Sequence, residues 1–182
     1  MGKLESDLKR MNFKNIGILG GSFDPPHKGH ITISTEAKKK FKLEKVIWAI
    51  TKRNPLKNKS SLSLKKRIYL CKKISSKYKF INVRYYELLI RSNRTINLLN
   101  YLKKRFSGCN FYLIMGADNL INFHKWRRWR EISSKCTILI FDRKGYKSKS
   151  LKSKSYKKLG KKVINFIKFK KVNISSSQLR KI

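Results

Sequence analysis

Two histidines, His27 and His30, lie three residues apart in a stretch rich in glycine and proline. The stretch, residues 20–30, reads Gly-Gly-Ser-Phe-Asp-Pro-Pro-His-Lys-Gly-His. Its leading glycines permit close backbone approach, and its prolines restrict the loop. An apolar run at 16–19 predicts a buried strand before it, and the pattern over 31–41 predicts a helix after it. Backbone amides at the helix start, with two imidazoles on one face of the first turn, favour a phosphate site.

Other interpretations of the histidines have less support. A His-x-x-His pair also occurs in metal sites, but no third ligand is placed near this one. The loop lacks the Gly-x-Gly-x-x-Gly spacing of an ordinary dinucleotide-binding site, and histidines occupy its helix entry. His124 stands apart from the pair, and an isolated histidine is more often a surface or packing residue than a catalyst. We therefore expect His27 and His30 to contact phosphate.

A second candidate helix start lies at residues 174–180, which read Ile-Ser-Ser-Ser-Gln-Leu-Arg. A serine followed three residues later by Gln178 is typical of a helix cap. Serine caps are common and need no function. Hydroxyl groups beside Arg180 at a helix N-terminus would also suit a phosphate, so both interpretations stay open.

Strand patterns alternate with helix patterns along the chain. The expected strands are residues 16–19, 45–50, 80–83, 111–115 and 137–141, and the expected helices are 31–41, 65–74 and 95–106. Residues 145–162 suit either a flexible excursion or a marginal helix, and 163–172 suit a last strand. Such alternation predicts the α/β class, with a parallel sheet covered by helices on both faces. Ligands of such sheets bind beyond the carboxyl ends of the strands, where the strand order switches.

The charge of the chain is strongly positive. Its 182 residues include 47 Lys and Arg against 9 Asp and Glu, a formal net charge of +38. The charge fits a nucleic-acid binder, an enzyme for small anionic substrates, or a composition that favours lysine at polar positions. Because the lysines are scattered rather than gathered in one stripe with aromatic residues, the compositional interpretation is favoured. Weak, salt-sensitive, nonspecific nucleic-acid binding is still expected.

The composition of the chain also predicts its cellular compartment and its domain organisation. Hydrophobic residues make up 40% of the chain, which favours a folded domain. Cys71, Cys109 and Cys136 are odd in number and widely spaced, which predicts neither disulfides nor a zinc site and suits a reducing cytoplasm. We find no apolar run of membrane-spanning length and no signal region, so no membrane partner is expected. Residues 1–14 are predicted to be an N-terminal extension, either disordered or a short surface helix, before a single domain at 15–182.

The stretches 20–30 and 174–180 together resemble the paired signatures of the nucleotidyltransferase superfamily, and more narrowly those of bacterial nicotinate mononucleotide adenylyltransferases. Residues 54–57, 94–96, 115–120 and 123–126 carry further resemblance, with the sequences Asn-Pro-Leu-Lys, Arg-Thr-Ile, Met-Gly-Ala-Asp-Asn-Leu and Phe-His-Lys-Trp. The resemblance thus covers most of the chain. It implies a single-domain, Rossmann-like parallel sheet and the activity of that family.

That activity transfers AMP from ATP to nicotinate mononucleotide during NAD biosynthesis, without a covalent enzyme intermediate. The resemblance implies that His27 and His30 contact the ATP phosphates and stabilise the charge of the transition state. Mg²⁺ would enter with ATP, held mainly by phosphates. The implied ATP-binding residues are Gly21, Ser22, Phe23, His27, His30, Ser176, Ser177 and Arg180. The implied nicotinate-nucleotide residues are Lys57, Thr95, Asp118 and Trp126, with Trp126 near the pyridine ring. The oligomeric state is not predicted.

The chain departs from the family pattern at several positions. Ser177 stands where the family usually has threonine, residues 54–57 lack the Pro-Pro-His of many relatives, and Arg127 stands where some have an aromatic residue. Phosphopantetheine adenylyltransferase, a neighbouring family, typically carries threonine in place of His27, which makes it the weaker match. A basic nucleic-acid-binding protein on the same scaffold is the alternative from another class, and net charge alone supports it.

Overall fold

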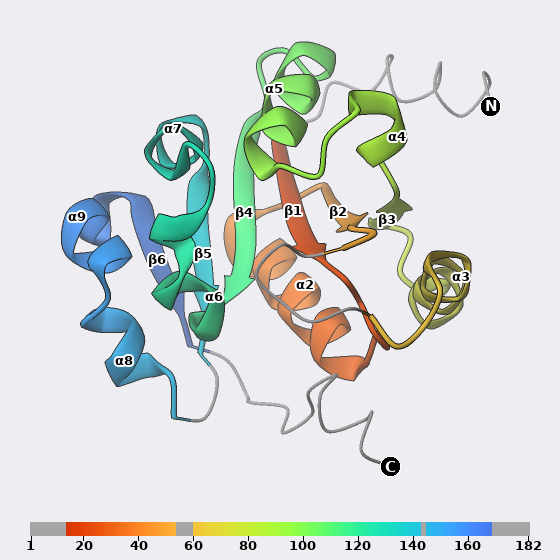
Figure 1. The fold of residues 1–182 in the computed structure, drawn as a ribbon, viewed down its shortest axis with the longest axis horizontal. Helices are drawn as coiled ribbons and strands as arrows, with labels where there is room; N and C mark the ends of the chain where they lie inside the picture. The colour runs from red at the N-terminus through yellow and green to blue at the C-terminus, as the bar shows by residue number, and fades with distance from the viewer. Residues whose placement is uncertain (1–13, 54–59, 143–144, 169–182) are drawn as a thin grey trace.

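The computed structural model describes residues 14–53, 60–142 and 145–168. Within these ranges six parallel strands form one sheet in the order β3-β2-β1-β4-β5-β6. Figure 1 shows them side by side, with β6 on the left and β3 on the right. The strands are β1 (Asn15–Gly21), β2 (Lys45–Ile50), β3 (Ile81–Arg84), β4 (Asn110–Gly116), β5 (Thr137–Phe141) and β6 (Ile164–Ile167).

Helices connect these strands. They are α2 (Lys28–Phe41), α3 (Leu64–Ser75), α4 (Glu87–Ile90), α5 (Thr95–Arg105), α6 (Ala117–Ile121), the 3₁₀ turn η1 (Phe123–Lys125), α7 (Trp129–Lys135), α8 (Lys147–Leu151) and α9 (Lys154–Val163). The predicted alternation of strands and helices is therefore confirmed, and the bounds of β2 and β5 agree with the prediction to the residue.

The alternating side chains of the strands divide between two apolar cores. On one face of the sheet, α2 and α3 contribute Ile31, Ala37 and Cys71. On the other face, α5, α6 and α7 contribute residues such as Leu99, Leu120 and Ile132. The sheet is covered on both faces, which confirms the α/β prediction.

The sheet has its topological switch at β1. From β1 the chain builds β2 and β3 on one side, then returns to pair β4 with the other side of β1. The loops after β1 and β4 leave the sheet at this position, where ligands of doubly wound sheets bind. The glycine-rich stretch with the two histidines is the loop after β1.

Three features differ from the sequence prediction or were left open by it. Residues 145–162, for which a flexible excursion or a helix was expected, contain α8 and α9, and β6 covers only residues 164–167 of the predicted last strand. The short helices α4, α6 and α7 and the turn η1 were not predicted. The fully buried residues of α3 are Arg67, Cys71 and Ser75, so an arginine lies on the inner side of this helix beside the partly buried Ile68 and Ile74.

None of the three cysteines, Cys71, Cys109 and Cys136, forms a disulfide. Burial raises the pKa of both Cys71 and Cys136 to about 12, so these two side chains stay protonated and pack as small apolar groups. In the described part of the chain, no helix combines the length and apolar character needed to cross a membrane.

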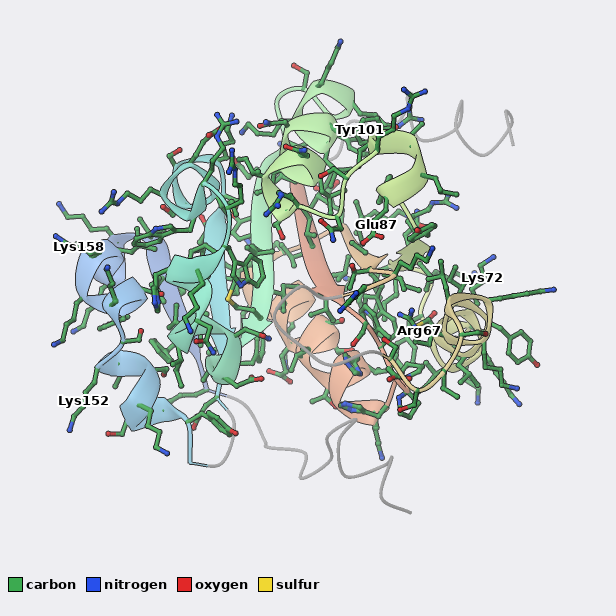
Figure 2. The ribbon with its side chains drawn as sticks, viewed as in Figure 1. Arg67, Lys72, Glu87, Tyr101, Lys152 and Lys158 are labelled. Atoms are coloured by element: carbon green, nitrogen blue, oxygen red, sulfur yellow. The ribbon has the colours of Figure 1, made fainter. Side chains whose placement is uncertain are left out.

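Exposed lysines extend from several helices. Lys72 on α3, Lys152 directly after α8 and Lys158 on α9 are exposed, and Figure 2 shows Lys72 on the opposite side of the molecule from the other two. The positive charge is thus distributed over separate elements. Only two salt bridges occur among the described residues, and both use Glu131.

Candidate active site

The two histidines meet at the start of α2. His27 is the N-cap residue, so it precedes the first helical turn in which it was predicted, and His30 lies three positions into the helix. The Nδ1 atom of His27 accepts the N–H of Gly29 at 3.2 Å, and Nδ1 of His30 accepts the N–H of His27 at 3.1 Å. These bonds form a capping box made by imidazoles in place of the usual Ser and Glu side chains. The ring centroids lie 4.0 Å apart.

The capping bonds determine where the imidazoles carry their protons. A ring nitrogen that accepts a hydrogen bond has no proton of its own. Each neutral ring therefore carries its proton on Nε2 and presents an N–H donor there. Two such donors, together with the positive end of the α2 dipole, suit the oxygens of a phosphate chain.

An aromatic layer supports the His30 ring. Phe23 is 2% exposed, its ring stacks on Trp48 at 5.0 Å, and it lies 4.8 Å from His30. The Trp48 indole N–H donates to Ser34 Oγ at 2.9 Å, and the Ser34 hydroxyl donates to the His30 carbonyl at 2.8 Å. Because the Phe23 side chain is packed in this layer, only the backbone of Phe23 is accessible to a ligand.

Asp24, in the same loop, fastens the segment that precedes α3. Its carboxylate is 3% exposed and accepts the backbone N–H groups of Ser61 at 2.7 Å and Leu62 at 2.9 Å. A buried carboxylate needs such donors, since burial without them is costly. The aspartate of the loop therefore connects the loop after β1 to the chain that follows β2.

We predict that Asp24→Asn destabilises the fold. The two carboxylate oxygens of Asp24 accept two backbone N–H groups, whereas an asparagine side chain has one acceptor oxygen, and its NH₂ group would face a backbone N–H donor. The expected cost is about 1–3 kcal/mol, which for a chain of this size corresponds to a fall of about 2–4 °C in Tm for each kcal/mol. Thermal denaturation measures it. Glu36→Gln on α2 removes the same charge and should leave Tm nearly unchanged; an equal fall in both variants would contradict the role of Asp24.

A cavity of about 190 Å³ opens beside this loop, between the carboxyl ends of β1, β2 and β4 and the start of α5. Its apolar floor includes Ile18, Ala49 and Met115. Gly21, the last residue of β1, and Ser22, the first residue of the loop that follows, contribute to its wall. A ligand in the cavity would thus lie directly next to the histidine loop.

The charged side chains in the cavity wall are mostly cationic. Arg94, Lys125 and Arg127 line it, and Glu87 is the only carboxylate among its described lining residues. The helix α5 begins at Thr95 in this wall, and its positive dipole end adds to the cationic field. The cavity is therefore suited to an anionic ligand with an apolar ring.

The structure brings several predicted site residues together. Thr95 and Trp126 line the cavity with Gly21 and Ser22. Asp118 lies in the first turn of α6 and is not one of the described residues that line the cavity; its neighbour Asn119 is. Lys57, Ser176, Ser177 and Arg180 lie outside the described residues.

Sequence reasoning missed three residues around the site: Asp24, Arg67 and Glu87. Their partners are mostly backbone groups distant in sequence, so the sequence does not indicate their roles, even for Asp24, which lies within the stretch 20–30. Arg67 did carry a signal, because a charged residue four positions before Cys71 falls on the buried face of α3. No group of three His, Cys, Asp or Glu side chains suitable for a metal occurs within the described ranges.

Comparisons with known proteins agree with this geometry. The family model described as cytidylyltransferase-like matches residues 18–182. A probable nicotinate-nucleotide adenylyltransferase from Pelagibacter ubique is 58% identical over the full length of both chains. One from Bradyrhizobium sp. (strain ORS 278) is 40% identical over 129 residues, which are 70% of this chain and 67% of that protein.

A solved structure shares the fold. The nicotinic acid mononucleotide adenylyltransferase of Plasmodium falciparum, in complex with NaAD, superposes with a TM-score of 0.74 and 22% identity, covering 92% of this chain and 83% of the other. The chain belongs to the nicotinate-nucleotide adenylyltransferase family of cytidylyltransferase-like proteins.

Proposed function

We propose that the protein transfers AMP from ATP to nicotinate mononucleotide, giving nicotinate adenine dinucleotide and pyrophosphate in NAD biosynthesis. The observation that carries the proposal is the juxtaposition of two sites. The imidazole pair at the start of α2 suits a phosphate chain, and the cationic cavity beside it suits an anionic nucleotide with an aromatic base. The relatives of the chain bear the name of this enzyme.

The reaction is a direct displacement. A phosphate oxygen of nicotinate mononucleotide forms a bond to the α-phosphorus of ATP, and the bond from that phosphorus to the bridging oxygen of pyrophosphate breaks, with the electron pair leaving on pyrophosphate. Negative charge grows on the bridging and α-phosphate oxygens. The Nε2–H groups of His27 and His30 would donate to these oxygens, and the dipole of α2 would favour the same charge. Catalysis then consists of positioning and charge stabilisation.

The remaining roles follow from the family resemblance. Ser176, Ser177 and Arg180 would hold the triphosphate from the opposite side, and Lys57 would contact a phosphate. Mg²⁺ would enter as part of the substrate MgATP, since the chain has few carboxylates to hold a metal and ATP supplies oxygens. Asp118 would contact the acceptor nucleotide from the first turn of α6.

Trp126 would stack on the pyridine ring of the acceptor. It lines the cavity, and its ring lies edge-on to Phe123, 5.3 Å between centroids, so the packing fixes its orientation. The cations Arg94, Lys125 and Arg127 would favour the nicotinate carboxylate over the neutral nicotinamide. The acidic acceptor is therefore the preferred one in this proposal.

The test is pyrophosphate release from MgATP with each of three acceptors: nicotinate mononucleotide, nicotinamide mononucleotide and phosphopantetheine. The proposal expects release with the first, a lower rate with the second and none with the third, with the dinucleotide identified by its mass. Turnover of phosphopantetheine alone would place the protein in the neighbouring family. Salt titration against RNA addresses the alternative from another class. Tight binding at high salt with no adenylyl transfer would favour it. The activity, and three cysteines that form no disulfide, both suit the cytoplasm.

A further inference from the structure

Arg67 on α3 is buried beneath the site, with 1% of its surface exposed. Four of its N–H groups donate to backbone carbonyls: Nε to Leu62 at 3.1 Å, Nη1 to Ser22 at 2.6 Å and Thr51 at 2.8 Å, and Nη2 to Lys52 at 3.0 Å. No carboxylate forms an ion pair with it among the described residues. A buried charge is expensive unless it is fully hydrogen-bonded, and these carbonyls supply the bonds. The guanidinium thus joins the loop after β1 to the chain after β2.

Glu87 holds the same dipeptide from its other side. One carboxylate oxygen accepts the hydroxyl of Thr51, and the other accepts the backbone N–H of Lys52 at 3.2 Å. The dipeptide thus donates to the Glu87 carboxylate on α4 through the Thr51 hydroxyl and the Lys52 N–H, and both of its carbonyls accept from the Arg67 guanidinium on α3. Figure 2 shows Arg67 and Glu87 on these separate elements. Charge-assisted bonds at both ends of a dipeptide hold it more firmly than neutral bonds would.

The dipeptide also contacts the end of β1, directly before the loop that carries the two histidines. The Thr51 N–H donates to the Gly21 carbonyl at 3.0 Å, beside the bond from Arg67 to Ser22. Ser22, Thr51 and Glu87 all line the cavity proposed for the acceptor. The chain of bonds therefore runs from the loop that begins the ATP site to the wall of the acceptor site.

We propose that Arg67 is a positioning residue for adenylyl transfer: it fixes the loop after β1 on the Thr51–Lys52 dipeptide, and through Glu87 it sets that loop relative to the acceptor cavity. The inference rests on the proposed function. In-line attack requires the acceptor phosphate and the α-phosphorus to lie within contact distance and in line, and small displacements between the two sites slow the reaction. Arg67 touches neither substrate in this proposal and acts through backbone carbonyls alone.

The test is Arg67→Lys. A lysine keeps the charge but lacks the planar fork that spans carbonyls of two segments. We expect kcat to fall about tenfold, while KM for MgATP and for nicotinate mononucleotide each stay within about threefold, because each half-site keeps its own contacts. Lys72→Met, on the exposed face of the same helix, should leave kcat and both KM values unchanged.

Glu87→Gln, which leaves Arg67 in place, and the double variant provide a second arm of the test. If both side chains act on one dipeptide, kcat of the double variant should equal that of the more impaired single variant. If the fold-loss of kcat in the double variant instead equals the product of the fold-losses in the two single variants, the two side chains act independently and the shared role is overturned.

Two controls distinguish a loss of positioning from unfolding of the variant and from failure of the proposed function. Assays run far below the Tm of every variant, with the folded fraction checked by circular dichroism. A wild-type kcat for Arg67→Lys, or a loss fully explained by unfolding, would overturn the proposal. The proposed function fails separately, if the wild-type protein itself releases no pyrophosphate.

Discussion

Replacing His30 with asparagine should lower kcat for adenylyl transfer by on the order of 10²–10³-fold, the effect of removing one positioned donor from developing charge. The oxygen of asparagine occupies nearly the place of imidazole Nδ1, so it can still accept the His27 N–H that closes the start of α2. What the variant loses is the N–H donor on Nε2. Single-turnover assays with saturating MgATP and nicotinate mononucleotide measure the effect on the chemical step.

His30→Ala provides the comparison. It removes both the donor and the capping bond, so it should lose activity to the same extent and lower Tm as well. His30→Asn should keep a Tm near that of the wild type. An unchanged kcat in His30→Asn would contradict the assigned role, and an equal loss of Tm in both variants would show that the activity is lost through the helix start.

The placement of the two histidines at a helix start after a strand could be predicted because its determinants are local. A strand, a glycine-rich turn and a helix start follow each other directly in residues 15–41, and capping, proline and glycine effects operate over a few residues. The same holds for β2 and β5, whose β-branched runs are short and bounded by polar residues. The fold class followed from the order of these elements alone.

The supports of the site could not be predicted in this way. Asp24 binds amides 37 and 38 residues away, and Arg67 binds a carbonyl 45 residues away. Such partners are backbone groups, which every residue possesses, so the sequence carries no sign of which ones meet. In a chain with 47 basic residues, one buried arginine is also hard to distinguish from the exposed ones. Only its place on the buried face of α3 sets Arg67 apart.

The charge pattern now has a physical interpretation. Exposed lysines on α3, α8 and α9 are distributed over the molecule, whereas carboxylates such as Asp24 and Glu87 bind the backbone around the site. The acidic residues are few, and several of them have structural roles. The cations of the cavity are therefore opposed by little negative charge, which makes the acceptor site attractive to an anionic nucleotide.

Trp126→Ala should weaken use of the acceptor and leave the ATP site intact. Stacking of a heteroaromatic base on an aromatic side chain is worth about 1–3 kcal/mol, and tenfold in affinity corresponds to about 1.4 kcal/mol. We therefore expect kcat/KM for nicotinate mononucleotide to fall by about 5- to 150-fold, with KM for MgATP within about twofold. Steady-state kinetics with each substrate varied in turn separate the two effects.

Two variants sharpen this prediction. Trp126→Phe keeps a ring in the cavity wall and should recover most of kcat/KM. Trp129→Ala removes a neighbouring indole that packs on Phe123 at 6.0 Å and is not among the described residues that line the cavity. If Trp126 acts by stacking on the substrate, Trp129→Ala should lower Tm and leave KM for the acceptor unchanged. An equal rise of KM in both variants would instead mean that loosened packing around Phe123, and not a lost ring contact, weakens acceptor binding.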